Sequence, residues 1–225
     1  GQDLAKQGAT VILADVNGEK VEALAADIRA NGGNAYGVKC DVRKVEDIEN
    51  AVAFTREKGG SVDIMIYTAG GFAGRIFNCP EPFQSRPYEV LDWGIDVNLK
   101  GALFFCRAVI GTMIEQKRGV MIVLGSIDGV TGSAWSVDYS AAKSGMIGMV
   151  KGLVLLGAPH NVRACCVSPG PVLTRAAMAN MPTPMGRAAE PQEVVDLILY
   201  LASDKAAFIS GDNYLIDGAR ACMVR

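Results

Sequence analysis

The strongest constraint on the fold is an alternation between short apolar runs and segments with helical periodicity, which continues along the whole chain. Between the apolar runs the apolar residues recur at helical spacing, as in residues 19–30, where Val21, Ala25 and Ile28 share one face. Strands that alternate with such helices form βαβ units and a parallel sheet. The sequence therefore predicts an α/β fold whose strands lie at 10–15, 35–40, 62–67, 120–124, 162–167 and 213–216.

The composition narrows the class of protein. With 225 residues, no internal repeat and no linker, we expect residues 1–225 to form one domain. A net charge of -2 argues against nucleic acid or a membrane surface as the partner. We find no apolar run that approaches the length of a membrane span and no signal peptide. The six cysteines form no Cys-x-x-Cys pair, so we expect reduced thiols in a cytoplasmic protein.

The single histidine restricts the chemistry further. A Ser-His-Asp hydrolase would need His160 as its base, and a histidine metal site would need more ligands than this chain offers. His160 lies in a segment rich in Gly, Pro and Asn, so we expect it on a surface loop. The sequence predicts no metal site.

The stretch from residue 120 to residue 143 combines a buried strand with three reactive side chains. Ser126 follows the apolar run 120–124, at the carboxyl end where open α/β sheets place their ligands. Asp138 is a suitable N-cap for a helix that continues to about residue 156. Tyr139 and Lys143 are four residues apart and would share one face of that helix.

This arrangement resembles the short-chain dehydrogenase/reductase family, whose motif is a serine followed by Tyr-x-x-x-Lys. The resemblance extends from the first residues to about Arg220. It implies a Rossmann-type, three-layer, doubly wound parallel sheet that binds a nicotinamide dinucleotide. It also implies that Tyr139 exchanges a proton with the substrate oxygen and that Ser126 orients that oxygen.

The resemblance gives Lys143 and Asn98 supporting roles. Lys143 would hold the cofactor ribose, and its ammonium would lower the pKa of the Tyr139 phenol by favouring the phenolate. Asn98, within the stretch 96–101, would carry a proton relay through water. The alternative for Asn98 is an ordinary asparagine inside a helix.

Further residues resemble the family's cofactor contacts. Asp15 ends a strand where an acid accepts hydrogen bonds from the adenosine ribose, although residues 15–18 also read as a simple turn. Residues 68–70 match the family's Asn-Ala-Gly with Thr68 in place of asparagine. With Tyr139 and Lys143, the full set expected at the cofactor is Asp15, Asp41, Val42, Ala69, Gly70, Pro169, Gly170, Val172 and Thr174.

One element of the family pattern is not found in this sequence. A dinucleotide-binding domain should open with a strand and a glycine-rich turn that holds the pyrophosphate, and no such turn precedes the first helix. That strand would lie mid-sheet, between the strands that end at Asp15 and Thr68. We therefore expect the sequence to be incomplete at its N-terminus. By the same resemblance, the segment between Thr174 and Pro184 is shorter than the substrate-covering segment usual in the family, which indicates a second shortfall there.

From these residues we predict an NAD-dependent oxidoreductase that interconverts a secondary alcohol and a ketone. NADP is the less favoured cofactor, because no basic residue follows Asp15 before the next helix. The alternatives are an NADP-dependent reductase of 3-oxoacyl thioesters or other carbonyls, and a non-catalytic relative that binds dinucleotide. The helix after Lys143 is apolar nearly all round, which predicts a homotetramer, as in the family.

Overall fold

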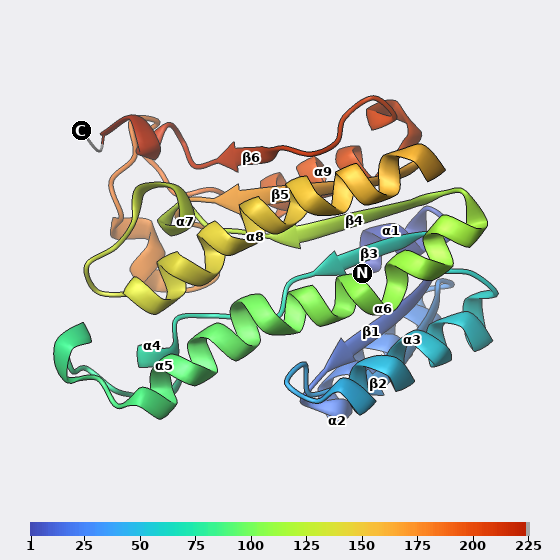
Figure 1. Cartoon of the computed structure of the whole chain (residues 1–225), viewed down its shortest axis with the longest axis horizontal. Helices are drawn as coiled ribbons and strands as arrows, with labels where there is room; N and C mark the ends of the chain where they lie inside the picture. The colour runs from blue at the N-terminus through green and yellow to red at the C-terminus, as the bar shows by residue number, and fades with distance from the viewer. Residues whose placement is uncertain (224–225) are drawn as a thin grey trace.

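The computed structural model describes residues 1–223, and Figure 1 shows helices and parallel strands that alternate along the chain. The strands lie within two residues of the predicted bounds; they are β1 (Thr10–Asp15), β2 (Asn34–Lys39), β3 (Ile64–Tyr67), β4 (Gly119–Leu124), β5 (Val162–Pro169) and β6 (Asn213–Ile216). Every strand pairing is parallel. The predicted α/β fold is confirmed.

The helices include longer ones, most of which cover the sheets, and short ones in the loops. The long ones are α2 (Gly18–Ala30), α3 (Val45–Gly59), α5 (Tyr88–Ile95), α6 (Gly101–Gln116), α8 (Val137–Gly157) and α9 (Pro191–Ala202). The short ones are α1 (Gln2–Lys6), α4 (Ala73–Ile76), η1 (Phe83–Ser85), α7 (Asp128–Thr131), η3 (Ala158–His160), η4 (Ala176–Asn180), η5 (Asp204–Ala206) and η6 (Arg220–Met223).

The strands form two separate sheets, β1–β2 and β3–β4–β5–β6. The arrowheads of both sheets point toward the same side of the molecule (Figure 1). Among residues 1–223, no strand pairs with the second edge of β1 or with the outer edge of β3.

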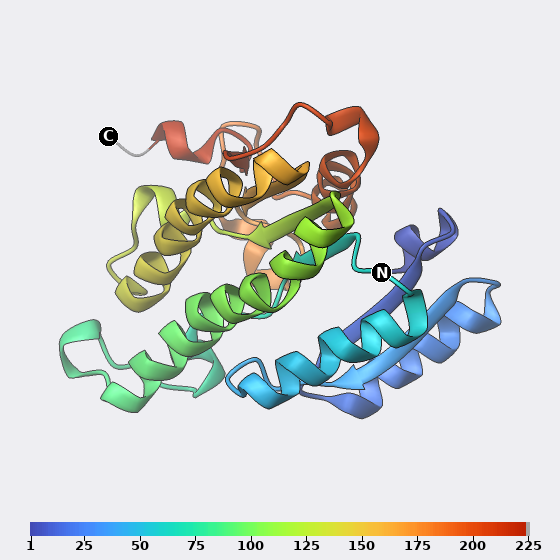
Figure 2. The same ribbon diagram turned by 45° about the vertical axis from the view of Figure 1, so that its right-hand side comes forward.

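Helices cover both faces of the four-stranded sheet, which makes the three layers of the predicted doubly wound fold. On one face, side chains of α6 and α8 pack on alternate strand residues, among them Met65, Tyr67, Met121, Val123 and Cys166. On the other face, α9 packs on the residues between them, which include Val120, Ile122, Cys165 and Val167. This period of two is the pattern of a sheet that is buried on both faces. Figure 2 shows α6 and α8 together on one side.

Two helical segments, Tyr88–Gln116 and Val137–His160, are long and apolar enough to cross a membrane by length and composition. We expected no segment of this kind from the sequence, because charged residues interrupt the apolar residues of both segments. Both segments supply side chains to the core of the four-stranded sheet, so packing accounts for much of their apolar character. Only 28% of the most apolar 18-residue stretch within the segment 137–160 is nevertheless buried.

Local structure differs from the prediction around the site. Asp138 is not the N-cap of α8; Ser136 holds that position, and the Asp138 side chain is buried. A turn of π-helix, η2 (Asp96–Lys100), lies between α5 and α6. The loop 72–87 contains α4 and η1, and α7 follows Ser126. His160 is exposed in η3, as expected for a surface histidine.

Candidate active site

Ser126 lies beyond the carboxyl end of β4, in a backbone held by the neighbouring strand. The Gly125 amide donates to the Val167 carbonyl at 2.7 Å, and the Ile127 amide donates to the Pro169 carbonyl at 2.9 Å. These two bonds on either side fix the backbone of Ser126. Its hydroxyl oxygen accepts from the Asp128 amide at 3.2 Å, the first contact of α7.

Tyr139 lies in the first turn of α8, is half-buried and lies near the Ser126 hydroxyl. Burial raises the pKa of its phenol above the ordinary value, and the Asp128 carboxylate raises it further. The Ser126 hydroxyl and the positive charges of Arg75 and Arg175 act in the opposite direction on this pKa. The predicted lowering of this pKa by Lys143 is therefore wrong for the protein alone, because burial outweighs the favourable charges.

Lys143 lies one turn along α8 and is 4% exposed. Its ammonium lies 5.4 Å from the centre of the Tyr139 ring and donates to the Leu124 carbonyl at 2.6 Å. Burial lowers the pKa of Lys143 to about 8. The protonated form of Lys143 is therefore less stable than that of an exposed lysine, and its ammonium lies beside the phenol.

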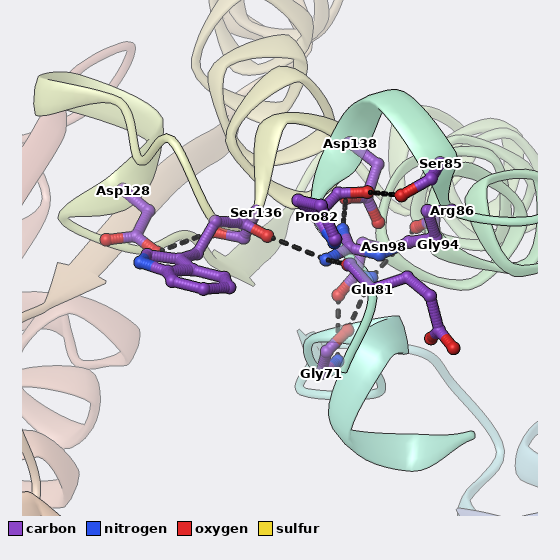
Figure 3. Close-up of polar contacts among 11 residues, drawn as sticks. Gly71, Glu81, Pro82, Ser85, Arg86, Gly94, Asn98, Asp128, Ser136 and Asp138 are labelled. Carbon is purple, nitrogen blue, oxygen red and sulfur yellow. Dashed lines mark hydrogen bonds and ion pairs between the residues drawn. The ribbon is translucent and has the colours of Figure 1, made fainter. Parts of the chain in front are cut away.

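Asn98 is fully buried in the π-helical turn η2, an irregularity that is frequent at functional sites. Its amide nitrogen donates to the carbonyls of Gly71, at 2.9 Å, and Gly94, at 2.8 Å. Its amide oxygen accepts from the Gly71 amide at 2.9 Å (Figure 3). Both amide protons of Asn98 are thus used by the backbone, and the side chain ties the loop after β3 to the helix.

The loop after β3 passes close to two of these side chains. Gly70 has φ +147°, and a Cβ there would clash with the amide oxygen of Asn98 and lie 3.5 Å from the Lys143 ammonium. Only glycine fits this backbone and this space. The structure therefore brings Gly70, Asn98, Lys143, Tyr139 and Ser126 together at one end of the sheet.

The other predicted cofactor residues lie at or after strand ends. Asp15 ends β1 and is exposed, and one of its carboxylate oxygens accepts from the Asn17 amide at 2.8 Å. Asp15 thus holds the turn as in the alternative interpretation, and its second carboxylate oxygen accepts no hydrogen bond within residues 1–223. Asp41 follows β2 and binds the Arg43 guanidinium at 2.6 Å, which lowers the pKa of its carboxyl. Val42 packs beside Gly101 at the start of α6.

The segment after β5 joins the site to the far side of the sheet. The Gly170 amide donates to the Ile216 carbonyl at 3.0 Å, and a Cβ there would lie 2.8 Å from the Asp217 Cα atom. Val172 forms an isolated parallel bridge with Ala189. Thr174 is exposed, and no contact to Ser126 or Tyr139 is found for it.

Several residues of this region were not predicted. Lys39 is the register partner of Asp15, and its side chain packs against Gly18. Arg86 forms a buried ion pair with Asp138, and Ser136 donates to Asp128 at 3.2 Å. The parallel register of the first two strands could have revealed Lys39, whereas no sequence signal links Arg86 to Asp138.

The described residues fit part of a nicotinamide dinucleotide. Lys143, buried with one carbonyl and one thioether contact, retains a proton for a ribose hydroxyl. Asp15 offers a carboxylate oxygen at the carboxyl end of β1, where the adenosine ribose lies in this class of fold. Residues 1–223 contain no glycine-rich turn for the pyrophosphate. Within the same residues there is no cluster of His, Cys, Asp and Glu that could hold a metal ion.

Known proteins share this architecture and sequence. Residues 1–219 match the family model described as enoyl-(acyl carrier protein) reductase. The chain is 31% identical to an L-rhamnose 1-dehydrogenase (NAD(P)(+)) of Azotobacter vinelandii, over 96% of this chain and 89% of that protein. It is 31% identical to a cyclopentanol dehydrogenase of Comamonas sp., over 96% of this chain and 88% of that protein.

A solved structure is also similar. The crystal structure of gox2181 superposes with a TM-score of 0.89 at 31% identity, over 97% of this chain and 88% of that chain. Its similarity covers nearly all of the fold described above. The chain therefore belongs to the short-chain dehydrogenase/reductase family and is an oxidoreductase that acts on CH–OH groups.

Proposed function

We propose that the protein interconverts a secondary alcohol and a ketone, with NAD as the preferred cofactor. The observation that carries the proposal is the Lys143 ammonium 5.4 Å from the centre of the Tyr139 ring, with the Ser126 hydroxyl near the same phenol. These groups offer a hydrogen-bond donor and a titratable proton at one point, which is what an alcohol or carbonyl oxygen requires.

The residues would divide the reaction as follows. A bound nicotinamide dinucleotide supplies the hydride acceptor or donor. Ser126 holds the substrate oxygen by a hydrogen bond, and Tyr139 takes the alcohol proton during oxidation or returns it during reduction. Lys143 binds a ribose hydroxyl and lies beside the Tyr139 phenol. Asn98 fixes the loop 70–71 against the helix, and its part in a proton relay through water stays a prediction.

The preference for NAD rests on Asp15. Its carboxylate at the end of β1 would accept a hydrogen bond from the free ribose hydroxyl and repel a phosphate at that position. A reductase that prefers NADP is the second candidate, and Lys39 favours it, because this base lies opposite Asp15 in the β1–β2 register. The third candidate, a non-catalytic dinucleotide binder, would have no need of a proton donor.

We also propose a cytoplasmic, homotetrameric enzyme. All six cysteines are free thiols, as is usual in a reducing compartment. The tetramer rests on the exposed apolar side chains at the end of α8, Leu155 and Leu156.

The test is an assay of the purified protein with NAD or NADP and a panel of secondary alcohols, followed by the absorbance of the reduced cofactor. We expect turnover with NAD on at least one alcohol, and loss of that turnover in Tyr139→Phe. Binding of reduced cofactor without turnover on any alcohol or ketone would instead support the non-catalytic relative.

A further inference from the structure

Arg86 and Asp138 form an ion pair inside the molecule, next to Tyr139. The Arg86 Nη1 atom donates to Asp138 Oδ1 at 3.2 Å, and the two side chains are 1% and 3% exposed. In every other ion pair within residues 1–223, both side chains are at least 14% exposed. Figure 3 shows Arg86 and Asp138 together among the polar contacts of this region.

The pair joins three separate segments of the chain. Arg86 Nη2 donates to the carbonyls of Glu81 and Trp135, at 3.0 Å each, so one side chain fixes its own loop and the turn before α8. Its guanidinium lies 4.9 Å from the centre of the Phe72 ring. A Cβ at Gly94 of α5 would clash with Asp138 Oδ2, so this side of the pair is closely packed. The loop 72–87, α5 and the start of α8 therefore meet at this pair.

The contacts continue from the pair to Ser126. Ser136, which precedes α8, donates to the Asp128 carboxylate at 3.2 Å, and the Asp128 amide donates to the Ser126 hydroxyl at 3.2 Å. Asp138 itself is the residue before Tyr139. Ser126 is thus connected through Asp128 and Ser136 to the turn that Arg86 binds at Trp135, and Tyr139 directly follows Asp138.

Stability alone does not explain why this pair is buried. Two of its atoms, Arg86 Nε and Asp138 Oδ2, are buried without a hydrogen-bond partner. Unpaired buried polar atoms destabilise a fold, and well-packed apolar residues often replace a buried ion pair without loss of stability. What a directional pair adds over apolar packing is a fixed geometry.

We propose that Arg86 and Asp138 are positioning residues, which hold the loop 72–87 against the first turn of α8 and thereby set the distance between Tyr139 and Ser126. The inference rests on the proposed function, since it assigns these residues to the same proton transfer. Displacement of a catalytic group by about 1 Å can cost on the order of 100-fold in rate.

The test compares three variants of the full chain: Asp138→Asn, the apolar double variant Arg86→Met with Asp138→Leu, and Asp63→Asn. Asp63 forms an exposed ion pair with Arg118 before the amino end of β3, at the opposite end of the strand from the site, and serves as the control. For each protein we measure kcat, KM, the dissociation constant of reduced cofactor and Tm. We also titrate the Tyr139 phenol by its ultraviolet absorbance, with Tyr139→Phe as the blank.

We expect Asp138→Asn to lower kcat by about 10- to 100-fold, with cofactor binding within about twofold of the parent. The pH at which the Tyr139 phenol titrates should also shift. Asp63→Asn should change neither kcat nor the titration of Tyr139. The double variant should recover the Tm lost in Asp138→Asn but not the kcat. If Asp138→Asn fails to fold, the double variant tests the positioning role by its kcat and its Tyr139 titration.

Two results would overturn the proposal. One is a double variant that is stably folded, with kcat and the Tyr139 titration both unchanged. The other is an Asp138→Asn protein whose only defect is a lower Tm. If the parent protein turns over no substrate at all, the proposed function fails, whereas the titration of Tyr139 still tests the positioning role.

Discussion

The Lys143 ammonium lies 5.4 Å from the centre of the Tyr139 ring, and its hydrogen bond to the Leu124 carbonyl ties α8 to the end of β4. Because the ammonium is nearly inaccessible, its charge is little screened by water. The same burial lowers its own pKa to about 8. Burial thus disfavours the charged form of both side chains: it lowers the pKa of Lys143 and raises the pKa of Tyr139.

Tyr139→Phe should abolish most turnover while leaving the cofactor in place. The phenol acts as a proton donor or acceptor in the chemical step, an effect worth about 100- to 10,000-fold in kcat. We expect the dissociation constant of reduced cofactor to stay within about threefold, measured by its fluorescence. Tyr88→Phe is the matched control, because Tyr88 is exposed at the start of α5. Near-normal kcat in Tyr139→Phe would show that another group transfers the proton.

Lys143→Met should increase the free energy of unfolding at pH 7 while it removes activity. The pKa of Lys143 is lowered from 10.5 to about 8 in the folded protein, so the buried charge destabilises the fold below pH 8. Its removal should stabilise the protein by on the order of 1–3 kcal/mol at pH 7, less the lost Leu124 hydrogen bond.

The contribution of Lys143 to the free energy of unfolding should change with pH in a direction fixed by its lowered pKa. Between the folded and unfolded pKa values the unfolded state binds more protons, so Lys143 makes stability rise with pH in that window. The advantage of Lys143→Met should therefore shrink from pH 8 toward pH 10.5 in urea unfolding. Equal stability of both proteins at every pH would contradict the burial of this charge.

The local parts of this site could be predicted from the sequence. Ser126, Tyr139 and Lys143 lie on one strand end and one helix, so spacing alone brings them together. The Arg86–Asp138 pair could not be predicted, because its partners are 52 residues apart and meet only when the loop folds onto α8. The raised pKa of Tyr139 was missed for a related reason. Its direction depends on burial by the whole site, which no local pattern reports.

Arg175→Gln should move the pH profile of alcohol oxidation to higher pH. The pKa of Tyr139 is raised by burial and by Asp128, and the positive charge of Arg175 opposes that rise. Loss of this charge makes the phenolate harder to form, so the pH at which oxidation becomes fast increases. Arg118→Gln, at the opposite end of the sheet, should leave the profile unchanged. An unshifted or acid-shifted profile in Arg175→Gln would remove Arg175 from the electrostatics of the site.

Leu155→Glu with Leu156→Glu should reduce the mass of the assembly. The two leucines are 81% and 55% exposed on α8, in a helix whose other side packs on the sheet. An exposed apolar surface of this kind is typical of an interface between copies. We expect light scattering at micromolar concentration to give a tetramer for the parent chain and a smaller species for the variant. A monomeric parent would contradict the tetramer directly.

Cofactor choice should depend on Asp15 and Lys39 in opposite ways. Asp15→Ala should narrow the preference for NAD, chiefly through the lost hydrogen bond to the ribose hydroxyl, with a smaller gain for NADP as the repulsion disappears. Lys39 is the register partner of Asp15, so its charge should attract the extra phosphate of NADP. Lys39→Ala should therefore widen the preference for NAD, by lowering kcat/KM for NADP by about tenfold and leaving that for NAD within about twofold. Lys205→Ala, on η5 beside α9, is the control for loss of a lysine charge. Equal or higher kcat/KM with NADP in the parent protein would overturn the assignment of NAD, and an unchanged NADP value in Lys39→Ala would remove Lys39 from the cofactor site.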